Sequence, residues 1–353
     1  MNKRHWQWCA AALLVVAGVG CGGDGPKGLD AGDGGSAGKA KPVKFVGFDA
    51  NEPLLQALRS GKLQGLVVQN PFQMGRLGVK TAVDALEKRD VTRKISTGET
   101  MVTPENIEDK EVASLVDPPK AENRGTPSGV KSGGKSWRVM VIPKGTTHEF
   151  WKSIHAGALK AAEELGNVEV IWQGPQKEDD RTLQIQLVQN AAGSGVDAIV
   201  LAPLDSRALV EPVEAAIAKG IKAVIIDSGL ESDKITSYVA TDNYRGGVLA
   251  ARRLGEVMGG KGRILFLRYM VGSASTDERE KGFTDTIAKE FPNLTYTSDT
   301  EYAGATSDAA QQKSQNLVTR FRGQFDGVFC PNESSTLGML RALEAAGLVL
   351  ETP

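Results

Sequence analysis

The stretch VKFVGFDANEPLLQALRSGKLQGLVVQNP, residues 43–71, reads as a strand, a helix and a second strand. The first apolar run ends in Asp49, the second ends in Gln69, and a segment with helical spacing lies between them. Continuous apolar strands on either side of a helix are typical of a parallel sheet that is buried on both faces. Polar side chains at the carboxyl ends of such strands face the crevice where open α/β proteins bind ligands. The stretch therefore predicts an α/β fold with Asp49 and Gln69 at a binding crevice.

The same alternation continues through the second part of the chain. Apolar strands are predicted at 137–145, 168–174, 197–204, 222–228, 237–243, 262–270, 294–304 and 325–332. Helical spacing predicts helices at 149–166, 180–195, 205–220, 246–260, 277–291, 307–321 and 335–348. This order indicates parallel sheets with helices on both faces, and 353 residues are enough for two domains.

The two ends of this pattern do not fit an ordinary order of elements. The predicted strand at 43–49 has no helix before it, and the predicted helix at 335–348 has no strand after it. Joined tail to head, they would form one helix–strand unit, and a stretch rich in proline, glycine and charge at 117–135 would connect the original ends. We therefore predict a circular permutation. The alternative is a piece of a longer tandem, in which residues 43–112 pair with a neighbouring copy.

The first residues, MNKRHWQWCAAALLVVAGVGCGG, combine a basic head with an apolar run that is too short to span a bilayer. Residues 1–21 resemble a bacterial lipoprotein signal that is cleaved before Cys21, which would then carry lipid. Gly18 stands where that pattern prefers an aliphatic residue, so an ordinary signal peptide is the alternative. Residues 22–42 hold 8 glycines and predict a flexible tether. We expect a membrane-anchored lipoprotein in the periplasm or at the cell surface.

Composition excludes some functions and leaves the ligand open. Lys and Arg (42) nearly balance Asp and Glu (43), which argues against an extended nucleic-acid surface. After removal of the leader and lipidation of the second cysteine, Cys330 remains, so no intrachain disulfide is expected. Cys330 closes the apolar run FDGVFC and is predicted to be a small buried residue rather than a reactive thiol.

Eight stretches carry a family resemblance. They are FWKSIHAGA, VDAIVLAPLDS, AVIIDS, YVATDNYRGG, DEREKGF, VFCPNESSTLGMLRAL, FVGFDA and GLVVQNPFQMG. In this cyclic order, residues 43–348 resemble the periplasmic sugar-binding proteins of the ribose and galactose type. The resemblance implies the type I periplasmic binding protein fold, circularly permuted: two Rossmann-like lobes with parallel sheets, joined by a hinge of three crossings.

The implied lobes are discontinuous in sequence. Their ranges are 72–92 and 136–240 for lobe one, 43–70, 94–112 and 243–353 for lobe two, and 113–135 for the permutation linker. The linker adds a fourth connection between the lobes, and about 20 residues of coil span roughly 25 Å. Such a connection permits hinge motion.

A monosaccharide presents paired hydroxyls, so its site needs side chains that accept and donate hydrogen bonds in pairs. The resemblance places such residues at strand ends and helix starts: Asp49, Gln69, Asp227, Arg279 and Asn332. The two Asp side chains would accept from hydroxyls, and the arginine fork would donate to sugar oxygens. The alternatives are structural: capping or turn residues for the Asp and Asn side chains, a hinge residue for Gln69, and a solvated helix face for Arg279.

Flat aromatic side chains are needed for the C–H faces of a sugar. Phe150 and Trp151 match the stacking aromatics of the family, although aromatics near a helix start are often core residues. His148 stands where many relatives have an amide or an acid, with an exposed loop histidine as the alternative. Tyr302 is predicted to form a second aromatic wall, although the spacing around it differs from that of the ribose proteins.

Two departures from the family concern the choice of sugar. Ser228 follows Asp227 where relatives for ribose often carry Arg, and the loop before Phe150 reads GTTHE. Gln69 is typical of the ribose-like relatives, whereas the glucose and galactose relatives commonly use Asn. The sequence therefore favours an aldopentose, with aldohexoses next.

The resemblance implies a monomeric solute-binding lipoprotein that closes on a monosaccharide and presents it to the permease of an ABC transporter. A sugar-sensing lipoprotein that signals to a membrane receptor is the alternative. No catalytic residue, metal or cofactor is expected, since the chain lacks H-E-x-x-H and C-x-x-C motifs. A lac-repressor-type regulator shares the fold, but it needs a DNA-binding head where this chain has an export signal.

Overall fold

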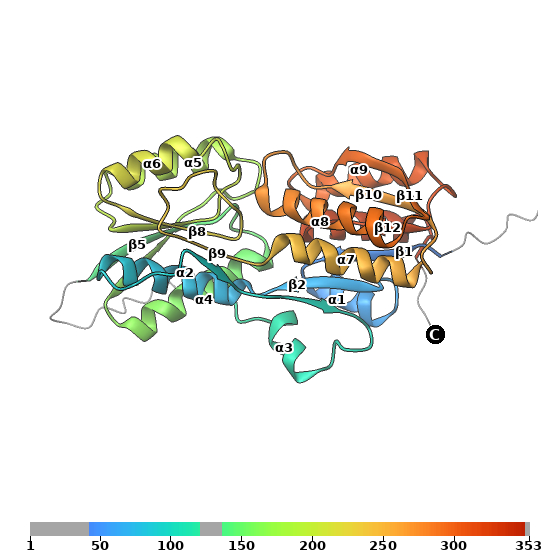
Figure 1. Ribbon diagram of the computed structural model, residues 1–353, viewed down its shortest axis with the longest axis horizontal. Coiled ribbons are helices and arrows are strands. Elements are labelled where there is room, and N and C mark those ends of the chain that lie inside the picture. The colour runs from blue at the N-terminus through green and yellow to red at the C-terminus, as the bar shows by residue number, and fades with distance from the viewer. Residues whose placement is uncertain (1–41, 121–135, 350–353) are drawn as a thin grey trace, which may run out of the picture. The chain divides into compact units, whose positions relative to one another are not determined.

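The computed structural model describes residues 42–120 and 136–349. Contacts separate residues 40–353 from the residues before them, and the described residues all belong to this unit. The predicted leader with Cys21, nearly all of the tether and most of the linker lie outside the described residues. The unit of residues 40–353 contains two sheets, each with its own helices (Figure 1).

Sheet A has six strands in the order β11-β10-β12-β1-β2-β4. Its pairs are parallel except for β2 with β4 at one edge, which are antiparallel. The strands are β1 (Lys44–Phe48), β2 (Gly65–Gln69), β4 (Glu99–Val102), β10 (Gly262–Arg268), β11 (Leu294–Tyr302) and β12 (Gly327–Phe329).

Sheet B also has six strands, in the order β3-β9-β8-β7-β5-β6, and all of its pairs are parallel. The strands are β3 (Lys94–Ser96), β5 (Trp137–Ile142), β6 (Val168–Trp172), β7 (Ala198–Leu201), β8 (Lys222–Ile226) and β9 (Ser237–Ala240). Apart from β3, the strands of sheet B lie in predicted lobe one and those of sheet A lie in predicted lobe two.

Helices cover both faces of each sheet. In lobe two, α1 (Glu52–Arg59), α3 (Lys110–Val116), α9 (Ser307–Arg320) and α10 (Glu333–Ala345) share one core with the sheet, and α7 (Asn243–Val257) and α8 (Ala274–Glu290) share the other. In lobe one, α2 (Pro71–Leu86) and α4 (Glu149–Leu165) cover one face, and α5 (Arg181–Ala191) and α6 (Val210–Ala218) cover the other. The predicted α/β class with parallel sheets is confirmed.

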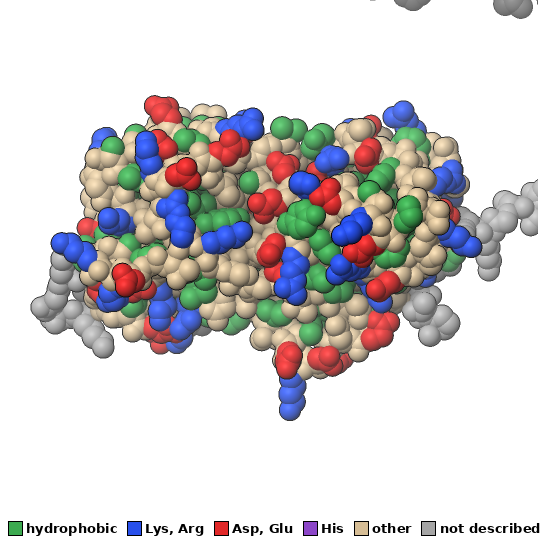
Figure 2. Space-filling model, in the orientation of Figure 1, with side chains coloured by type: hydrophobic (Ala, Val, Ile, Leu, Met, Phe, Trp, Pro, Cys, Tyr) green, Lys and Arg blue, Asp and Glu red, His purple; other side chains and the backbone are tan. Residues whose placement is uncertain are grey.

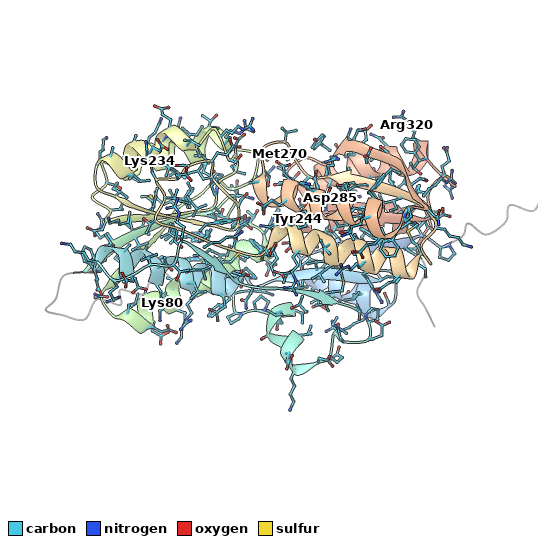
Figure 3. The ribbon with its side chains drawn as sticks, in the orientation of Figure 1. Lys80, Lys234, Tyr244, Met270, Asp285 and Arg320 are labelled. Carbon is cyan, nitrogen blue, oxygen red and sulfur yellow. The ribbon has the colours of Figure 1, made fainter. Side chains whose placement is uncertain are left out.

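Glycines let two helix pairs approach closely, which positions the ends of those helices. A Cβ atom added at Gly157 of α4 would lie 2.0 Å from the carbonyl oxygen of Phe72 in α2. A Cβ atom added at Gly282 of α8 would lie 2.0 Å from the carbonyl oxygen of Tyr244 in α7. The α7–α8 pair is also joined by a hydrogen bond from the Tyr244 hydroxyl to Asp285, 3.1 Å long (Figure 3). Both α4 and α8 begin at the predicted binding crevice.

Two predicted boundaries are wrong. The strand β3 pairs with β9 in sheet B, so residues 94–96 belong to lobe one and the crossing follows at Thr97 and Gly98. A three-residue edge strand carries too little apolar pattern to be assigned to a sheet from sequence. Residues 113–116 are the end of α3, and Val116 is buried in the core of lobe two, so the linker begins after Val116.

The described ends of the chain meet within lobe two. The strand β1 pairs in parallel with β12 on one side and β2 on the other. The backbone amide of Val43 donates a 2.9 Å hydrogen bond to the carbonyl of Leu348, just after α10. The helix that ends the described chain therefore leads directly to the strand that begins it.

Candidate functional site

A pocket lies where the carboxyl ends of strands from both sheets meet. Its lining residues come from both lobes: Asp49, Gln69, Lys144, His148, Phe150, Trp151, Glu178, Asp227, Tyr269, Ser275, Thr276, Arg279, Asn332 and Glu333. Eight of the nine predicted ligand-binding residues are among them. Tyr302, at the end of β11, is the ninth; it is 41% exposed and is not among the residues that line this pocket, so it does not form a second aromatic wall here.

Asp49 is the centre of the lobe-two side of the pocket. It follows β1 in a left-handed conformation (φ 64°). Its carboxylate accepts a 2.6 Å hydrogen bond from the Gln69 side chain and a 3.0 Å bond from the backbone amide of Glu333. Burial raises the pKa of Asp49, and the nearby charge of Arg279 and the Gln69 hydrogen bond oppose this shift only in part. A hydroxyl that donates to this carboxylate would stabilise its charged form.

Arg279 is buried at the start of α8 and is not part of a solvated helix face. Its guanidinium donates to the side-chain oxygens of Asn243 (2.8 Å) and Gln69 (2.8 Å) and to the carbonyl of Pro331 (2.9 Å). It also lies 4.6 Å from the centre of the Phe48 ring. Arg279 thus fixes the orientation of Gln69 and supplies positive charge to the lobe-two wall.

Lys144 was missed by sequence reasoning. Its ammonium lies 3.0 Å from the carboxylate of Asp227, and both side chains are 5% exposed. Lys144 also donates across to lobe two, to the hydroxyls of Ser273 (3.4 Å) and Ser275 (3.3 Å). Lys144 therefore supplies a cation beside Asp227. The residue after Asp227, where ribose relatives often carry an arginine, is Ser228 in this chain. The available signal was its place two residues after a buried strand, β5.

Glu178 joins the two lobes at the pocket. It accepts hydrogen bonds from Trp151 Nε1 (2.6 Å) and His148 Nδ1 (3.1 Å) in lobe one. It also accepts a hydrogen bond from the hydroxyl of Tyr269, which follows β10 in lobe two. Glu178 lies in the loop after β6, in the charged run QKEDD, which gave no signal that separates it from its neighbours.

The histidine–carboxylate pair is strongly coupled. Burial by itself would lower the pKa of His148, but the hydrogen bond and negative charge of Glu178 outweigh it and raise this pKa to about 9. Burial would raise the pKa of Glu178, and its bonds from His148, Tyr269 and Trp151 lower it instead, to about 2. Both partners are charged at neutral pH, so this wall of the pocket holds a buried ion pair.

The two predicted aromatics lie side by side at the start of α4. The Phe150 and Trp151 rings are 4.9 Å apart in an edge-to-face arrangement at 88°. Trp151 also belongs to the lobe-one core and is fixed by its bond to Glu178. Phe150 is partly buried against the same core. Both the binding role and the core role named for these residues are therefore compatible with their places.

Asn332 caps α10, which was the structural role named as the alternative for this residue, and it also lines the pocket. Its side chain accepts from the amide of Ser335 (3.3 Å) and donates to the hydroxyl of Ser334 (3.0 Å). The next residue, Glu333, was missed by sequence reasoning. Its Oε1 accepts a 2.9 Å hydrogen bond from Asn51 Nδ2, and its Oε2 is buried without a hydrogen-bond partner.

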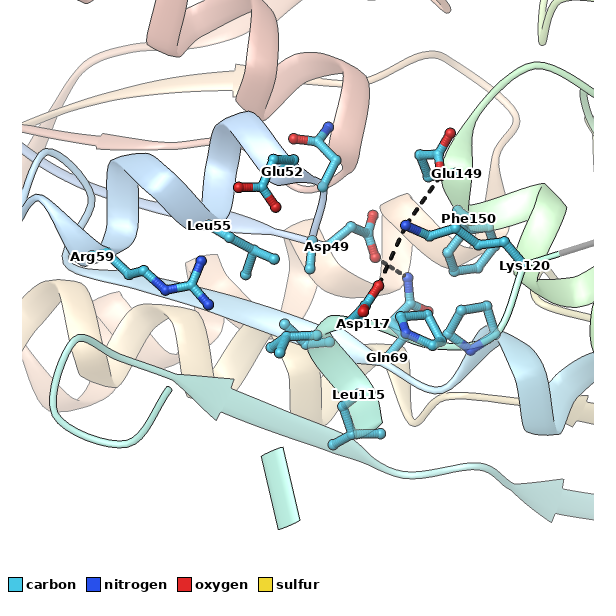
Figure 4. Close-up of a pocket in the computed structure, with 16 residues that line it drawn as sticks. Asp49, Glu52, Leu55, Arg59, Gln69, Leu115, Asp117, Lys120, Glu149 and Phe150 are labelled. Carbon is cyan, nitrogen blue, oxygen red and sulfur yellow. Dashed lines mark hydrogen bonds and ion pairs between the residues drawn. The ribbon is translucent and has the colours of Figure 1, made fainter. Parts of the chain in front are cut away.

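A second, outer pocket of about 200 Å³ adjoins the first and shares Asp49, Gln69 and Phe150 with it (Figure 4). Lys120 reaches across this pocket from the chain segment after α3. Its ammonium lies 3.5 Å from Asp117 and 3.3 Å from Glu149 at the start of α4 (Figure 4). The connection after α3 therefore touches lobe one beside the predicted binding crevice.

Two further searches of residues 42–120 and 136–349 gave negative results. No cluster of three or more His, Cys, Asp or Glu side chains in this part of the chain could hold a metal ion. Within the same residues, no helix combines the length and the apolar character needed to cross a bilayer. Cys330 is buried in the lobe-two core, and burial raises the pKa of its thiol, as predicted for an unreactive cysteine.

Comparison with known proteins identifies the family. A family model described as a periplasmic binding protein domain matches residues 33–90 and 139–352. The chain belongs to this family of periplasmic binding proteins. Among curated relatives, this periplasmic binding protein is similar to a xylitol-binding protein of Mycolicibacterium smegmatis, with 31% identity over 181 residues. The match covers 51% of each chain, so it spans about half of that relative.

Further relatives are named for a sugar or for sugar transport. A ribose import binding protein of Bacillus subtilis is 29% identical over 216 residues, which are 60% of this chain and 67% of that protein. A solved periplasmic component of an ABC-type sugar transport system from Hahella chejuensis is 33% identical with a TM-score of 0.56, covering 60% of this chain and 76% of that one. A solved carbohydrate transporter solute-binding protein from Agrobacterium radiobacter, in complex with D-arabinose, is 31% identical with a TM-score of 0.57 and covers 60% and 72%.

Proposed function

We propose that this protein is an exported solute-binding protein that captures a monosaccharide between its lobes and delivers it to an ABC importer. One observation carries the proposal: polar and aromatic residues of both lobes converge on one pocket at the carboxyl ends of the strands. The carboxylates of Asp49 and Asp227 would accept from sugar hydroxyls, and Lys144 and Asn332 would donate. The Phe150 and Trp151 rings would cover an apolar face of the ring. The sugar names of several relatives support the same ligand class.

The lobes must open for a sugar to bind. The pocket as it stands encloses about 30 Å³, well below the roughly 300–1,000 Å³ of small-molecule pockets. Hydrogen bonds close it from both sides: Tyr269 donates to Glu178, and the amide of Ser275 donates to the hydroxyl of Ser228 (3.1 Å). Hinge opening would break these bonds, and closure on a sugar would restore them around the ligand.

The favoured sugar remains a ribose-like pentose, with hexoses next. Names of relatives include ribose, apiose and arabinose, which supports pentoses. Delivery to a sensor is the second candidate function. It is supported by a solved fructose-binding periplasmic domain of a hybrid two-component system, 25% identical with a TM-score of 0.55.

We also propose that lipid on Cys21 anchors the protein to a membrane, with residues 22–42 as the tether. The sequence pattern before Cys21 supports this proposal. The full-length chain would be expressed in a bacterium, and its mass and membrane association would be measured. We expect a diacylglycerol-modified, membrane-bound form, and a Cys21→Ser variant that is released; an unmodified wild-type chain in the soluble fraction would contradict the anchor.

The arrangement of strands supports a circular permutation. The strand β1 lies between β12 and β2, and Val43 bonds to Leu348, so the present ends lie where one loop would join α10 to β1. The test is a chain that runs from residue 136 to 349 and continues into residues 42–116. We expect it to be a folded monomer that melts within a few degrees of the natural chain. Unfolding of the rejoined chain, or a domain-swapped dimer of the natural one, would refute the permutation.

Calorimetric titration of residues 22–353 with ribose, xylose, arabinose, allose, glucose and galactose tests the binding function. Light scattering on the same sample gives the mass. We expect one-to-one binding of at least one sugar by a monomer, and a loss of binding of more than tenfold in Asp49→Asn. A folded monomer that binds none of these sugars, or an Asp49→Asn variant with unchanged affinity, would contradict the proposed site.

A further inference from the structure

The pocket holds one more acid than it holds cations. The acids are Asp49, Glu178, Asp227 and Glu333, and the cations are Lys144, His148 and Arg279. Two of the acids have an ion-pair partner within the pocket, since Lys144 binds Asp227 and His148 binds Glu178. Asp49 has no ion pair but is stabilised by hydrogen bonds and by the nearby charge of Arg279. Glu333 is therefore the acid whose charge is least compensated.

Glu333 also carries an unused hydrogen-bond acceptor. The residue is only 9% exposed; its Oε1 accepts from Asn51, and its Oε2 has no partner. In the described part of the chain, five other buried side-chain oxygens lack a partner, and all five are hydroxyls. A buried carboxylate oxygen without a donor is costly, because charged groups need hydrogen bonds or a counter-ion when water is removed. Glu333 lines the pocket, so a ligand bound there could supply the donor that Oε2 lacks.

The charges around Glu333 favour a cationic donor. Burial raises the pKa of Glu333, the positive charge of His148 opposes the shift, and the negative charges of Asp49 and Glu178 add to it, giving a pKa of about 7. The carboxylate of Asp49 is held close by its bond to the Glu333 amide. At pH 7 about half of the molecules then carry an ionised Glu333, and a neutral hydroxyl would fill its acceptor but leave that negative charge uncompensated in the closed site. An ammonium group would do both, since charge-assisted hydrogen bonds are roughly twice as strong as neutral ones.

We propose that the ligand of this pocket is an amino-substituted monosaccharide, whose ammonium group donates to Glu333 Oε2. The proposal rests on the proposed function, because the remaining hydroxyls would use the same carboxylates and donors as a neutral sugar. Glu333 is then the specificity-determining residue: it separates an amino sugar from the parent sugar that carries a hydroxyl at the same carbon. The two loops that meet there, β1–α1 with Asn51 and β12–α10 with Glu333, would form the subsite for the amine.

Matched sugar pairs test the proposal by titration calorimetry at pH 7. The pairs are D-ribosamine with D-ribose and D-glucosamine with D-glucose, and N-acetyl-D-glucosamine is the neutral control. We expect the amine to bind at least tenfold more tightly than its parent in at least one pair, and N-acetylation to remove the preference. A parent sugar that binds as well as its amine in both pairs would overturn the proposal and leave sugar binding intact. No binding by any of these sugars or by the neutral panel would overturn both.

A charge-removing variant makes the test specific to the carboxylate. Glu333→Gln keeps the side-chain length and an oxygen for Asn51, and it removes the negative charge. We expect it to lower the ratio of amine affinity to parent affinity at least tenfold. The matched control is Glu163→Gln on α4, whose side chain is 71% exposed and is not among the residues that line the pocket; the ratio should not change. An undiminished ratio in Glu333→Gln, with a melting temperature that shows the variant is folded, would overturn the assignment.

Discussion

The His148–Glu178 ion pair makes the stability of this protein depend on pH in a defined direction. The pKa of His148 rises from 6.5 to about 9 in the folded state. At about 1.4 kcal/mol for each pH unit, this shift contributes roughly 3 kcal/mol to the free energy of unfolding. Because the pKa is higher in the folded state, protonated His148 stabilises the folded protein fully below pH 6.5, and this contribution is lost as the pH rises from 6.5 to 9. The His148 side chain is 22% exposed, so screening by solvent reduces the figure only modestly.

The acid side of the profile reports the same pair. The pKa of Glu178 falls from 4.5 to about 2 on folding. Because the pKa is lower in the folded state, ionised Glu178 stabilises the folded protein above pH 4.5, and this contribution is lost as the pH falls from 4.5 to 2. The two shifts describe one interaction, so their free energies are not added. Between about pH 4.5 and 6.5 the pair contributes its full stabilisation.

The perturbation is His148→Gln, which keeps a hydrogen-bond donor and removes the charge. Urea unfolding of the parent and variant at pH 5.5, 7.5 and 9.5 gives the difference in unfolding free energy. We expect this difference to be largest at pH 5.5 and to shrink by about 3 kcal/mol at pH 9.5. His155, whose pKa is lowered by burial, is present in both proteins, so its titration cancels.

The titration of Glu333 requires a control. Glu333 has a pKa of about 7 and feels the charge of His148, so its own titration would change between parent and variant. Both proteins are therefore also compared in a Glu333→Gln background, where that titration is absent. A difference that stays constant within about 1 kcal/mol from pH 5.5 to 9.5 in this background would refute the assigned pairing.

Two further substitutions test the buried ion pair and the close helix crossing. Replacing Lys144 by Met leaves the Asp227 carboxylate buried without its partner, so we expect the free energy of unfolding to fall by about 3–5 kcal/mol. Most of this loss should be recovered in the double variant Lys144→Met/Asp227→Asn. Urea unfolding of both variants measures this, and equal losses in the two would argue against the pair. Gly157→Ala places a Cβ atom 2.0 Å from the Phe72 carbonyl oxygen and must separate α2 from α4, so we expect the free energy of unfolding to fall by about 3 kcal/mol. In the control Gly193→Ala, the nearest atom is 3.7 Å from the new Cβ, and the fall should be less than about 1 kcal/mol. Similar melting temperatures for the two variants would contradict the close crossing.

The pattern of apolar runs predicted most of the strands and helices because buried strands and amphipathic helices leave a strong periodic signal. The strand at 43–49 and its partner ending in Gln69 were found this way, and they form β1 and β2. The edge strand β3 was assigned to the wrong lobe because it has three residues, of which only Ile95 is partly buried, and so short a run carries no such signal. Helix α3 was partly taken as linker because it is a short helix in which Val112 and Val116 are buried and Leu115 is partly buried.

Position along the chain also predicted part of the site. Asp49, Gln69 and Asp227 each follow or end an apolar strand, and the geometry of parallel sheets brings such ends together. Lys144 and Tyr269 obey the same rule and could have been found by applying it to every strand. Glu178 could not, because nothing in a charged loop indicates which acid turns inward.

The balanced charges of the composition also appear on the surface, where Lys, Arg, Asp and Glu side chains intermingle on the face shown in Figure 2. Composition predicts this mixing of charges because most charged side chains are exposed, so the surface carries nearly the same balance of acids and bases as the whole sequence. It does not predict the inner pocket, where one acid exceeds the cations.

The sequence by itself determined the α/β class, the two sheets and the side chains that stand at strand ends, because these depend on local periodicity and on the direction of each strand. Only the tertiary structure decided which of these groups are paired. Glu178 and Tyr269 are 91 residues apart, and Lys144 meets Ser275 from 131 residues away. The energies of such pairs depend on separation and desolvation, which exist only once the lobes are packed together. The charge state of His148, the orientation of Gln69 by Arg279 and the unused oxygen of Glu333 therefore follow from the fold.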